Sequence, residues 1–476
     1  MQIKLALPKG RLLPSTNILL QKARLELSDY EEKSRSYRPQ CNSLPNLFLK
    51  MFHEKDIPIQ VAVGNYDLGI CGLDWVEELL VKYPSSALVK VRNLGYGKNN
   101  LYIAIGVSTG TSSLEELNAK AEIIRIATEY PNLAESFALN MRLRRFKIFP
   151  LWGAAEVYPP ESADLTLVSH VFPETLFKHG LVPLTSILQS SALLIANRHS
   201  WEHKDMSFLL HYLHAVDSIE EKAVNKELET KDSTERREFS PQFPDTGLSL
   251  ALPDGHQQQP TLEFLNQVGL KVWDYSSESR RPNISLDGVN VKVIRPQDMP
   301  LQVANKNFDL AITGQDWLYA HLCRFPSSPV KELLELGFGK VRIVAVVSQE
   351  LPVDSVQNLR ELLKSSKLST LRIASEYIDI ADRYARDNHL SPYRLIPTWG
   401  ASEVFLPEDA DLLIENVQTG QTIARHNLKI IDTVFESSAC LIGNIHTSPL
   451  KQQKIDYVIQ LLRQAVLTDD KTLKRG

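Results

Sequence analysis

The stretch NYDLGICGLDW at residues 65–75 decides the fold, because it returns with little change as NFDLAITGQDW at residues 307–317. Other segments repeat in the same order: LALPKGRLLP (5–14) as LALPDGHQQQ (250–259), LGYGK (94–98) as LGFGK (336–340), IATEY (126–130) as IASEY (373–377), WGAAEV (152–157) as WGASEV (399–404), and SSALLIAN (190–197) as SSACLIGN (437–444). A period this long indicates that a whole domain was duplicated, since solenoid repeats are much shorter.

Length and composition agree with two soluble domains. The 476 residues are too many for one hydrophobic core, and 43% of them are apolar and 23% charged. A net charge of −4 gives no reason to expect nucleic acid or an anionic membrane as a partner. The four cysteines lack metal-ligand spacing, and the N-terminal residues read neither as a signal peptide nor as a membrane span. We therefore expect a cytoplasmic protein.

We expect the first copy to span residues 1–219 and the second to span residues 248–476, with a linker at 220–247 between them. The linker is dense in charge, contains two prolines and lacks apolar periodicity. Within each copy, short β-rich runs alternate with helical patterns, which indicates an α/β fold with largely parallel sheets. The apolar run IQVAV (59–63) is read as part of a strand. Ligands of such sheets bind beyond the carboxyl ends of the strands.

One such strand end, in the second copy, has the composition of a phosphate-binding loop. The strand ADLLIENV (410–417) is followed by QTGQT (418–422) and the start of a helix. Gly420 lets backbone N–H groups approach an anion, and the neighbouring threonines add hydroxyl donors. Glu415, near the end of the strand, suits acceptance of hydrogen bonds from sugar hydroxyls. An ordinary strand-to-helix turn with a threonine cap is the alternative interpretation.

The first copy has lost this loop. Its equivalent, SHVFPET (169–175), carries changes that are all hostile to a sugar phosphate: Pro173 for Gly420, Phe172 for Thr419, Glu174 for Gln421 and Val168 for Glu415. Proline removes a backbone donor, the ring fills the anion's path, and the glutamate repels it. We therefore expect no phosphate binding at this loop.

The second copy has lost the opposite element. LPKGR in the first copy places Lys9 and Arg11 around a glycine, whereas LPDGH in the second has Asp254 and His256 at these positions. A guanidinium suited to bidentate phosphate contact is gone, and a carboxylate has appeared. Each copy thus keeps the anion-binding element that the other has lost, which favours one composite site shared by the copies.

In combination and in this order, LPKGRL (7–12), DLGICG (67–72), DLAITG (309–314), the two LG[YF]GK turns, RPQDMP (295–300) and ADLLIENVQTGQT resemble ATP phosphoribosyltransferase, the first enzyme of histidine biosynthesis. The resemblance covers nearly the whole chain apart from the linker. It implies that each copy is a two-lobed α/β unit like the type II periplasmic binding proteins, and that the two copies form an intrachain pseudo-dimer. The reaction of the family joins N1 of ATP to C1 of phosphoribosyl pyrophosphate (PRPP) and releases pyrophosphate, with Mg²⁺ bound on PRPP and no protein metal site.

The resemblance also implies roles for individual residues. Catalytic charge would come from Arg11, from Lys9, and from one arginine of the second copy, which is either Arg280 or Arg281. PRPP would be held by Glu415, Gln418, Thr419, Gly420, Gln421 and Thr422. ATP or another part of the substrates would contact Arg295, Asp298, Lys340 and Glu403. The short form of the family works with a regulatory subunit that resembles histidyl-tRNA synthetase, so such a partner is possible here, as is a higher homo-oligomer.

Two other functions stay open at this point. Motifs are damaged in both copies, which also suits a non-catalytic or regulatory paralogue that binds PRPP or a nucleotide. Trp152 and Trp399 stand where the family usually has a polar residue, which also suits a phosphoribosyltransferase with a different acceptor. A secreted solute-binding protein would share the architecture, but a signal peptide is not recognisable.

Overall fold

The structure is a computed structural model that describes residues 2–32, 34, 36–85, 87–107, 110, 113–120, 122–214, 247–276, 280–365 and 368–473. The expected linker therefore lies outside the described residues except for Gly247. Contacts divide the chain into two compact units. The first unit is built on the first copy and includes residues 399–404, while the second unit is built on the second copy and includes residues 151–162.

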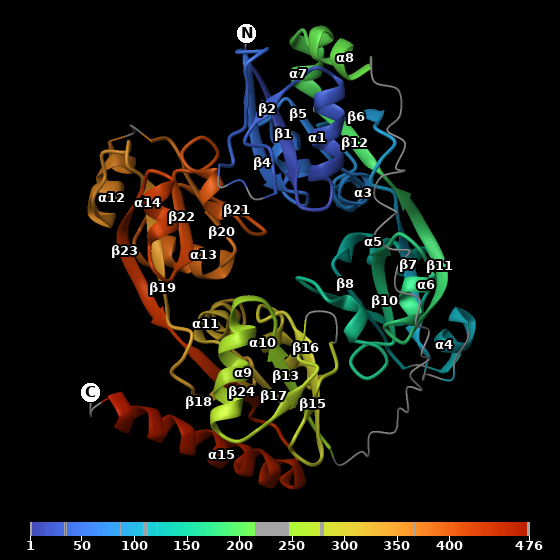
Figure 1. The fold of residues 1–476 in the computed structure, drawn as a ribbon, viewed down its shortest axis with the longest axis vertical. Coiled ribbons are helices and arrows are strands. Elements are labelled where there is room, and N and C mark those ends of the chain that lie inside the picture. The colour runs from blue at the N-terminus through green and yellow to red at the C-terminus, as the bar shows by residue number, and fades with distance from the viewer. Residues whose placement is uncertain are drawn as a thin grey trace. The chain divides into compact units, whose positions relative to one another are not determined.

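The first lobe of the first copy is a five-stranded sheet in the order β4-β1-β5-β12-β6. Its strands are β1 (Ile3–Lys9), β4 (Leu47–His53), β5 (Leu68–Gly72), β6 (Leu88–Asn93) and β12 (Ala192–Asn197). Its helices are α1 (Leu13–Lys22), α2 (Ile57–Ala62), α3 (Leu73–Lys82), α7 (Arg198–His203) and α8 (Ser207–His214). Strand β12, green in Figure 1, lies between the blue strands β5 and β6, so the chain returns to this lobe after building the other one.

The second lobe is a five-stranded sheet in the order β11-β7-β10-β8-β9. Its strands are β7 (Asn99–Gly106), β8 (Ile124–Thr128), β9 (Phe146–Pro150), β10 (Leu165–His170) and β11 (Leu181–Ser190), and its helices are α4 (Leu114–Lys120), α5 (Pro131–Asn140) and α6 (Glu174–Phe177). The chain enters this lobe from β6 into β7 and leaves it from β11 into β12, so two crossing segments join the lobes.

The second copy repeats both sheets, in the orders β16-β13-β17-β24-β18 and β21-β20-β22-β19-β23. The strands of these two sheets are β13 (Leu248–Pro253), β16 (Val289–Ile294), β17 (Leu310–Gly314), β18 (Val330–Glu335), β19 (Val341–Ser348), β20 (Leu371–Ser375), β21 (Tyr393–Pro397), β22 (Leu412–Val417), β23 (Leu428–Ser437) and β24 (Ala439–Asn444). Its helices are α9 (Gln258–Gln267), α10 (Met299–Ala304), α11 (Gln315–Arg324), α12 (Val356–Lys364), α13 (Ile378–Asp387), α14 (Gln421–Arg425) and α15 (Pro449–Leu473). The expectation of two tandem copies of a two-lobed α/β unit is confirmed.

Two details differ from the expectations. The sheets are mixed rather than largely parallel, because the returning strand β12 pairs antiparallel with both of its neighbours while β1 pairs parallel with β4 and β5. The run 59–63 lies mostly in helix α2 rather than in a strand. Proline in the first turn of α2 fixes a helical φ, and apolar residues buried around a short helix cannot be distinguished from a buried strand by pattern.

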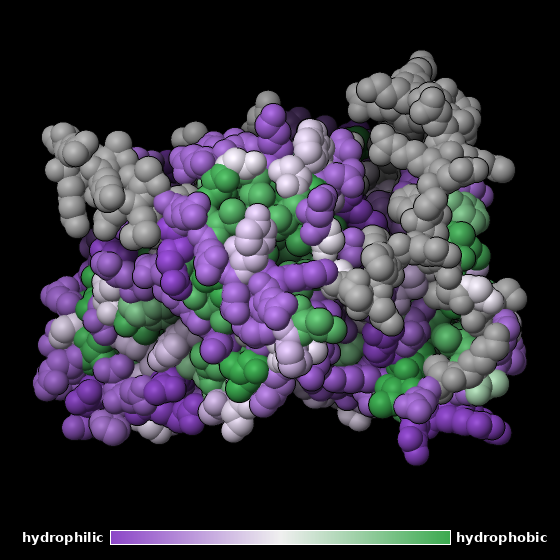
Figure 2. Space-filling view, turned by 90° about the horizontal axis from the view of Figure 1, so that it is seen from below, coloured by the Kyte–Doolittle hydropathy of each residue, from purple (hydrophilic) through white to green (hydrophobic). Residues whose placement is uncertain are grey.

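Hydrophobic residues fill a separate core in each lobe. Leu5, Leu7 and Leu49 are among the buried residues of the first lobe, and Ile343, Ile373 and Ile414 belong to the core of the lobe that carries β22. The face shown in Figure 2 mixes hydrophilic and hydrophobic residues. Among the described helices, none combines the length and the apolarity that crossing a membrane requires.

Candidate functional site

The loop after β22 has the local geometry that the sequence predicts. The strand ends at Val417, and Gly420, with φ of 76°, is the N-cap of α14. A positive φ is accessible to glycine at little cost, and the cap turns the chain sharply at this point. The side chains of Gln418, Thr419, Gln421 and Thr422 are exposed. The loop therefore presents hydroxyls, amides and first-turn N–H groups to solvent.

Glu415 lies two residues before the end of β22, opposite Val344 on β19. Its Oε1 accepts a hydrogen bond of 2.9 Å from the backbone N–H of Asn416. The carboxylate thus reaches forward along the chain, toward the carboxyl end of the strand where the loop begins.

The equivalent loop of the first copy is occupied by its own side chains. Pro173 is the N-cap of α6, and Phe172 is 51% exposed. The hydroxyl of Thr175 donates to the carbonyl of Phe172 at 2.6 Å and lies 3.0 Å from His170 Nδ1. Val168, at the position of Glu415, is buried. The first-copy loop therefore differs from the loop after β22, because proline stands at the N-cap where the second copy has Gly420 with a positive φ.

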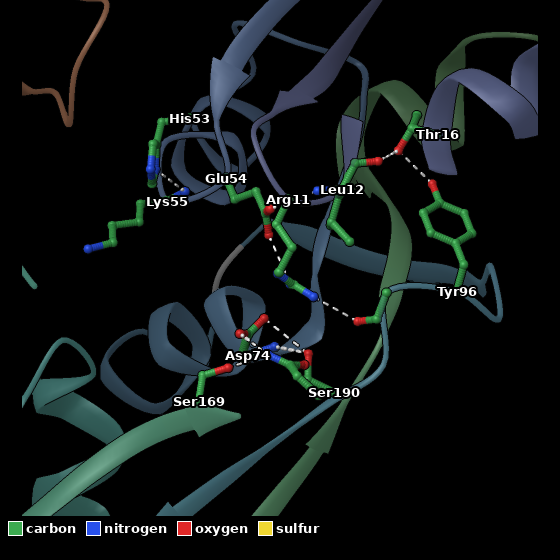
Figure 3. Close-up of polar contacts among 12 residues, drawn as sticks. Arg11, Leu12, Thr16, His53, Glu54, Lys55, Asp74, Tyr96, Ser169 and Ser190 are labelled. Atoms are coloured by element: carbon green, nitrogen blue, oxygen red, sulfur yellow. Dashed lines mark hydrogen bonds and ion pairs between the residues drawn. The ribbon is translucent and has the colours of Figure 1, made fainter. Parts of the chain in front are cut away.

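Lys9 and Arg11 of LPKGR, which the sequence predicts to contact phosphate, lie at the turn after β1. Gly10 has φ of 88°, and Arg11 donates through Nη1 to the carbonyl of Gly97 at 2.9 Å and through Nη2 to Glu54 at 3.2 Å (Figure 3). Burial raises the pKa of Glu54, and the Arg11 charge opposes this effect. Lys9 donates to the Tyr37 hydroxyl at 3.0 Å and lies 4.5 Å from the centroid of that ring.

In the second copy, Arg280 and Arg295, for which the sequence predicts substrate contacts, both donate hydrogen bonds to a carboxylate of the protein. Asp254, which is 4% exposed, accepts from Arg280 Nη1 at 2.6 Å and from Arg295 Nη1 at 3.3 Å. Arg280 Nε also lies 3.8 Å from Glu156. The cluster is close to charge-balanced, so Asp254 lowers the attraction that these arginines would exert on a phosphate. The role of both arginines in substrate binding stays a prediction.

Arg281 and Asp298 contact the segment 151–162 within the second unit. Arg281 donates to both oxygens of Glu161, at 2.9 and 3.1 Å, and to the carbonyl of Pro159 at 2.8 Å. Burial alone would raise the pKa of Glu161, but Arg281 and Lys292 outweigh it and lower this pKa to about 2. Both oxygens of Asp298 accept from the N–H of Trp152 at 3.1 Å. These contacts give Arg281 and Asp298 a structural role, and their ligand contacts stay predictions.

The two remaining predicted residues lie in different units. Lys340 is exposed and precedes β19, directly after Gly339 with φ of 62°. Glu403 is half-buried in a 3-10 turn, Ser402–Phe405, and belongs to the segment that is grouped with the first unit. That unit also contains Lys9 and Arg11.

A buried polar network at the junction of the lobes was not foreseen as a functional element. Asp74 accepts from Ser190 at 3.0 Å, Tyr130 at 3.0 Å and Asn99 at 3.2 Å, and Figure 3 shows it between Ser169 and Ser190. The second copy repeats it with Asp316, Ser437 and Tyr377. The repeated motifs LDW/QDW, EY and SSA carry the aspartate, the tyrosine and the serine of each network, so the signal in the sequence is their recurrence in both copies.

Known proteins resemble the chain in the same regions. The family model described as HisG, ATP phosphoribosyltransferase, matches residues 53–217 and 295–464, which together exceed half of the chain. The ATP phosphoribosyltransferase of Saccharolobus solfataricus is 35% identical over 200 residues, which cover 41% of this chain and 64% of that protein. The enzyme of Chlorobaculum parvum is 31% identical over 226 residues, 46% of this chain and 71% of its own length.

Among solved structures, the ATP phosphoribosyl transferase (HisG:HisZ) complex of Thermotoga maritima matches 45% of this chain and 98% of the other chain, with 22% identity and a TM-score of 0.38. The chain spans less than two thirds of the Saccharolobus relative. Both segments matched by the family model fall in the two repeated copies, one in each. The chain belongs to the HisG family, the family of ATP phosphoribosyltransferases.

Proposed function

We propose that this protein is an ATP phosphoribosyltransferase that joins N1 of ATP to C1 of PRPP in the first step of histidine biosynthesis. The observation that carries the proposal is the loop after β22, where Gly420 with φ of 76° caps α14 and exposed Thr419 and Thr422 flank it, in a chain of this family. Such a turn suits the 5-phosphate of PRPP, because backbone N–H groups and hydroxyls can surround its oxygens.

We further propose one composite active site per chain, which needs groups from both copies. The second copy supplies the loop and Glu415, and the first supplies Lys9 and Arg11. The support is complementary loss: the first copy has Phe172 and Pro173 in its loop, and the second has Asp254 in place of Lys9.

In the reaction, a bond forms between ATP N1 and C1 of the ribose as the bond from C1 to the pyrophosphate oxygen breaks. Little acid–base chemistry is needed, so the protein contributes positioning and charge. The loop amides hold the 5-phosphate, and Glu415 accepts hydrogen bonds from the ribose hydroxyls. Arg11 and Lys9 stabilise the negative charge that grows on the leaving pyrophosphate.

We propose that Mg²⁺ enters with PRPP, bound by the diphosphate oxygens, and neutralises part of the charge on the leaving group. In the part of the chain that the structure describes, no group of three or more His, Cys, Asp or Glu side chains is placed to hold a metal ion. The donor set around the loop, with one carboxylate and several hydroxyls and amides, fits a metal carried by the substrate.

The experiment exchanges loop residues between the copies. Thr419→Phe gives the second copy the ring of the first, and Phe172→Thr makes the reverse change at a position that is also exposed. Formation of phosphoribosyl-ATP from ATP, PRPP and Mg²⁺ should fall by more than 100-fold in Thr419→Phe, with PRPP binding lost in calorimetry, and should stay unchanged in Phe172→Thr. Normal PRPP binding by Thr419→Phe, or the absence of product with the wild-type protein alone and with a histidyl-tRNA-synthetase-like regulatory subunit, would contradict the proposal.

The pairing of Arg280 and Arg295 with Asp254 favours a second candidate, a regulatory or non-catalytic member of the family that binds PRPP or a nucleotide. Such a protein would bind PRPP in calorimetry without turnover under any of these conditions. A screen of purine nucleotides in the same assay would also reveal a phosphoribosyltransferase with a different acceptor.

A further inference from the structure

In the second copy, the network around Asp316 extends to Asn416 on the strand that carries the loop after β22. Asp316 is buried at the start of α11, and its Oδ1 accepts from the Ser437 hydroxyl at 3.0 Å. Its Oδ2 accepts from the Tyr377 hydroxyl at 2.6 Å. The Tyr377 oxygen is in turn 2.8 Å from Nδ2 of Asn416, the residue after Glu415 on β22. A chain of hydrogen bonds thus runs from the lobe junction to the strand that carries the loop.

The direction of these bonds fixes the orientation of the Asn416 amide. A carboxylate that accepts from two hydroxyls leaves the Tyr377 proton committed to Asp316. The Tyr377 oxygen can then only accept from Asn416, so the NH₂ group of Asn416 must face it. The carbonyl Oδ1 therefore points away from Tyr377. Asn416 is exposed, and among the described residues none donates a hydrogen bond to this oxygen.

We infer that Asn416 Oδ1 is a second acceptor for the sugar of a pentose 5-phosphate, acting beside Glu415 and determining selectivity for a vicinal diol. Asn416 follows Glu415 directly near the carboxyl end of β22 (Leu412–Val417), so both side chains originate next to the loop. Two neighbouring hydroxyls are two donors, and two adjacent acceptors match them. This inference rests on the proposed function, because it assigns the sugar of the same site.

The first copy supports the assignment by contrast. There the amide belongs to Asn99 on β7, which donates inward to Asp74 at 3.2 Å and also contacts Ser169, the residue in the place of Asn416. Asn99 pairs with Ser190 in the first copy, and Val341 pairs with the equivalent serine, Ser437, in the second. Val341 therefore occupies the position of Asn99. The first copy thus has its asparagine, Asn99, buried on β7 beside the degenerate loop, whereas the second copy has its asparagine, Asn416, exposed on β22 beside the retained loop.

The expected effect is a change in selectivity rather than a general loss of binding. A ribose hydroxyl that donates to Asn416 adds one hydrogen bond, which corresponds to a factor of roughly 3 to 12 in affinity. A 2-deoxy sugar lacks one of the two hydroxyls. The wild-type protein should therefore prefer ribose 5-phosphate over 2-deoxyribose 5-phosphate, and loss of the acceptor should reduce this preference.

The experiment measures the dissociation constants of ribose 5-phosphate and 2-deoxyribose 5-phosphate by calorimetry. Asn416→Ser introduces the residue of the first copy, and Tyr377→Phe removes the hydroxyl that orients the amide. Asn388→Ser is the matched control, because Asn388 Nδ2 donates to a backbone carbonyl, that of Tyr384, at 3.0 Å, on the same lobe. We expect the ratio of the two constants to fall at least threefold in both test variants and to stay unchanged in the control.

The outcomes separate this inference from the proposed function. Ribose 5-phosphate binding with an unchanged ratio in Asn416→Ser would overturn the role of Asn416 and leave the proposed function intact. Absence of binding of PRPP and of both sugar phosphates to the wild-type protein would overturn both. If Tyr377→Phe unfolds, Asn416→Ser alone decides, because its side chain is exposed and its truncation opens no cavity.

Discussion

Asp254 Oδ2 lies 2.6 Å from Arg280 Nη1, and the same two positions in the first copy hold Lys9 and Tyr37 at 3.0 Å. The equivalence follows from the backbone, because Tyr37 and Arg280 accept hydrogen bonds from Met51 and Val293 at matching places in β4 and β16. A cation beside a phenol has thus become a carboxylate beside a guanidinium. The new carboxylate of Asp254 and the new guanidinium of Arg280 neutralise each other, so the replacement of the lysine at position 254 depends on the arginine at position 280.

This pairing predicts a large loss of stability on removal of the carboxylate. Asp254→Asn leaves Arg280, whose side chain is 14% exposed, next to Arg295 with little opposing charge. Removing one partner of a buried pair typically costs about 3–5 kcal/mol, and Glu156 should offset part of it. Urea denaturation should show the decrease. The control Asp387→Asn removes an exposed partner of Arg383 and should leave the midpoint unchanged.

The sequence predicts the duplication, the two-lobed fold and the strand–loop–helix element around Gly420, because each has a local signal in repetition, periodicity or turn chemistry. It does not predict the partners of Arg280. Arg280 and Asp254 are 26 residues apart, and their contact depends on the placement of a turn against β16. The apolar run at 59–63 also led to a wrong strand prediction, because a short buried helix such as α2 has the same apolar pattern as a buried strand.

The orientation of the Asn416 amide is another feature of the site that the sequence does not predict. Its position after Glu415 is evident in the sequence, yet its meaning depends on which atom faces Tyr377. That orientation follows from a hydrogen-bond chain through three segments of the second copy. LDW/QDW and EY recur in both copies, but their recurrence does not show that Asp316, Tyr377 and Asn416 are linked by hydrogen bonds.

The ion pair of Lys55 leads us to expect that the first copy is more rigid than the second. Its Nζ lies 2.6 Å from Glu129 Oε2 and 4.8 Å from the Trp75 ring, so it joins the two lobes of the first copy. The second copy has Gln297 at this position. We expect Lys55→Gln to raise hydrogen exchange at the start of α5 by about 10-fold, because a partly buried ion pair is lost. Lys90→Gln, which breaks the exposed pair with Glu77, should leave that exchange unchanged.

His321 predicts a dependence of stability on pH. Burial, and next the charge of Arg324, lower its pKa from 6.5 to about 4 in the folded protein. The unfolded chain binds the proton more tightly, so stability is full above pH 6.5 and falls as the pH decreases toward 4. With a discount for partial exposure, we expect a loss of about 2 kcal/mol over this range. NMR titration of His321 gives the pKa, and His321→Gln should flatten this part of the stability profile. A His321 pKa near 6.5 would contradict the prediction.

We expect replacement of Arg11 to affect stability and catalysis separately. Its guanidinium compensates Glu54, whose side chain is 7% exposed and also accepts from the Leu12 N–H at 3.3 Å. Arg11→Ala leaves that buried carboxylate with only the backbone donor. We expect a loss of roughly 1–3 kcal/mol in unfolding free energy, measured by urea denaturation.

Glu54→Gln combined with Arg11→Ala should recover most of that stability, because the amide carries no charge and its oxygen still accepts from Leu12. If Arg11 acts on pyrophosphate, the double variant stays at least 100-fold slower than wild type in forming phosphoribosyl-ATP, although it is folded. Recovery of activity together with stability would show that Arg11 serves the fold alone. Because the guanidinium is 41% exposed while Glu54 is buried, the arginine keeps donors available to a ligand, and we expect the double variant to stay inactive.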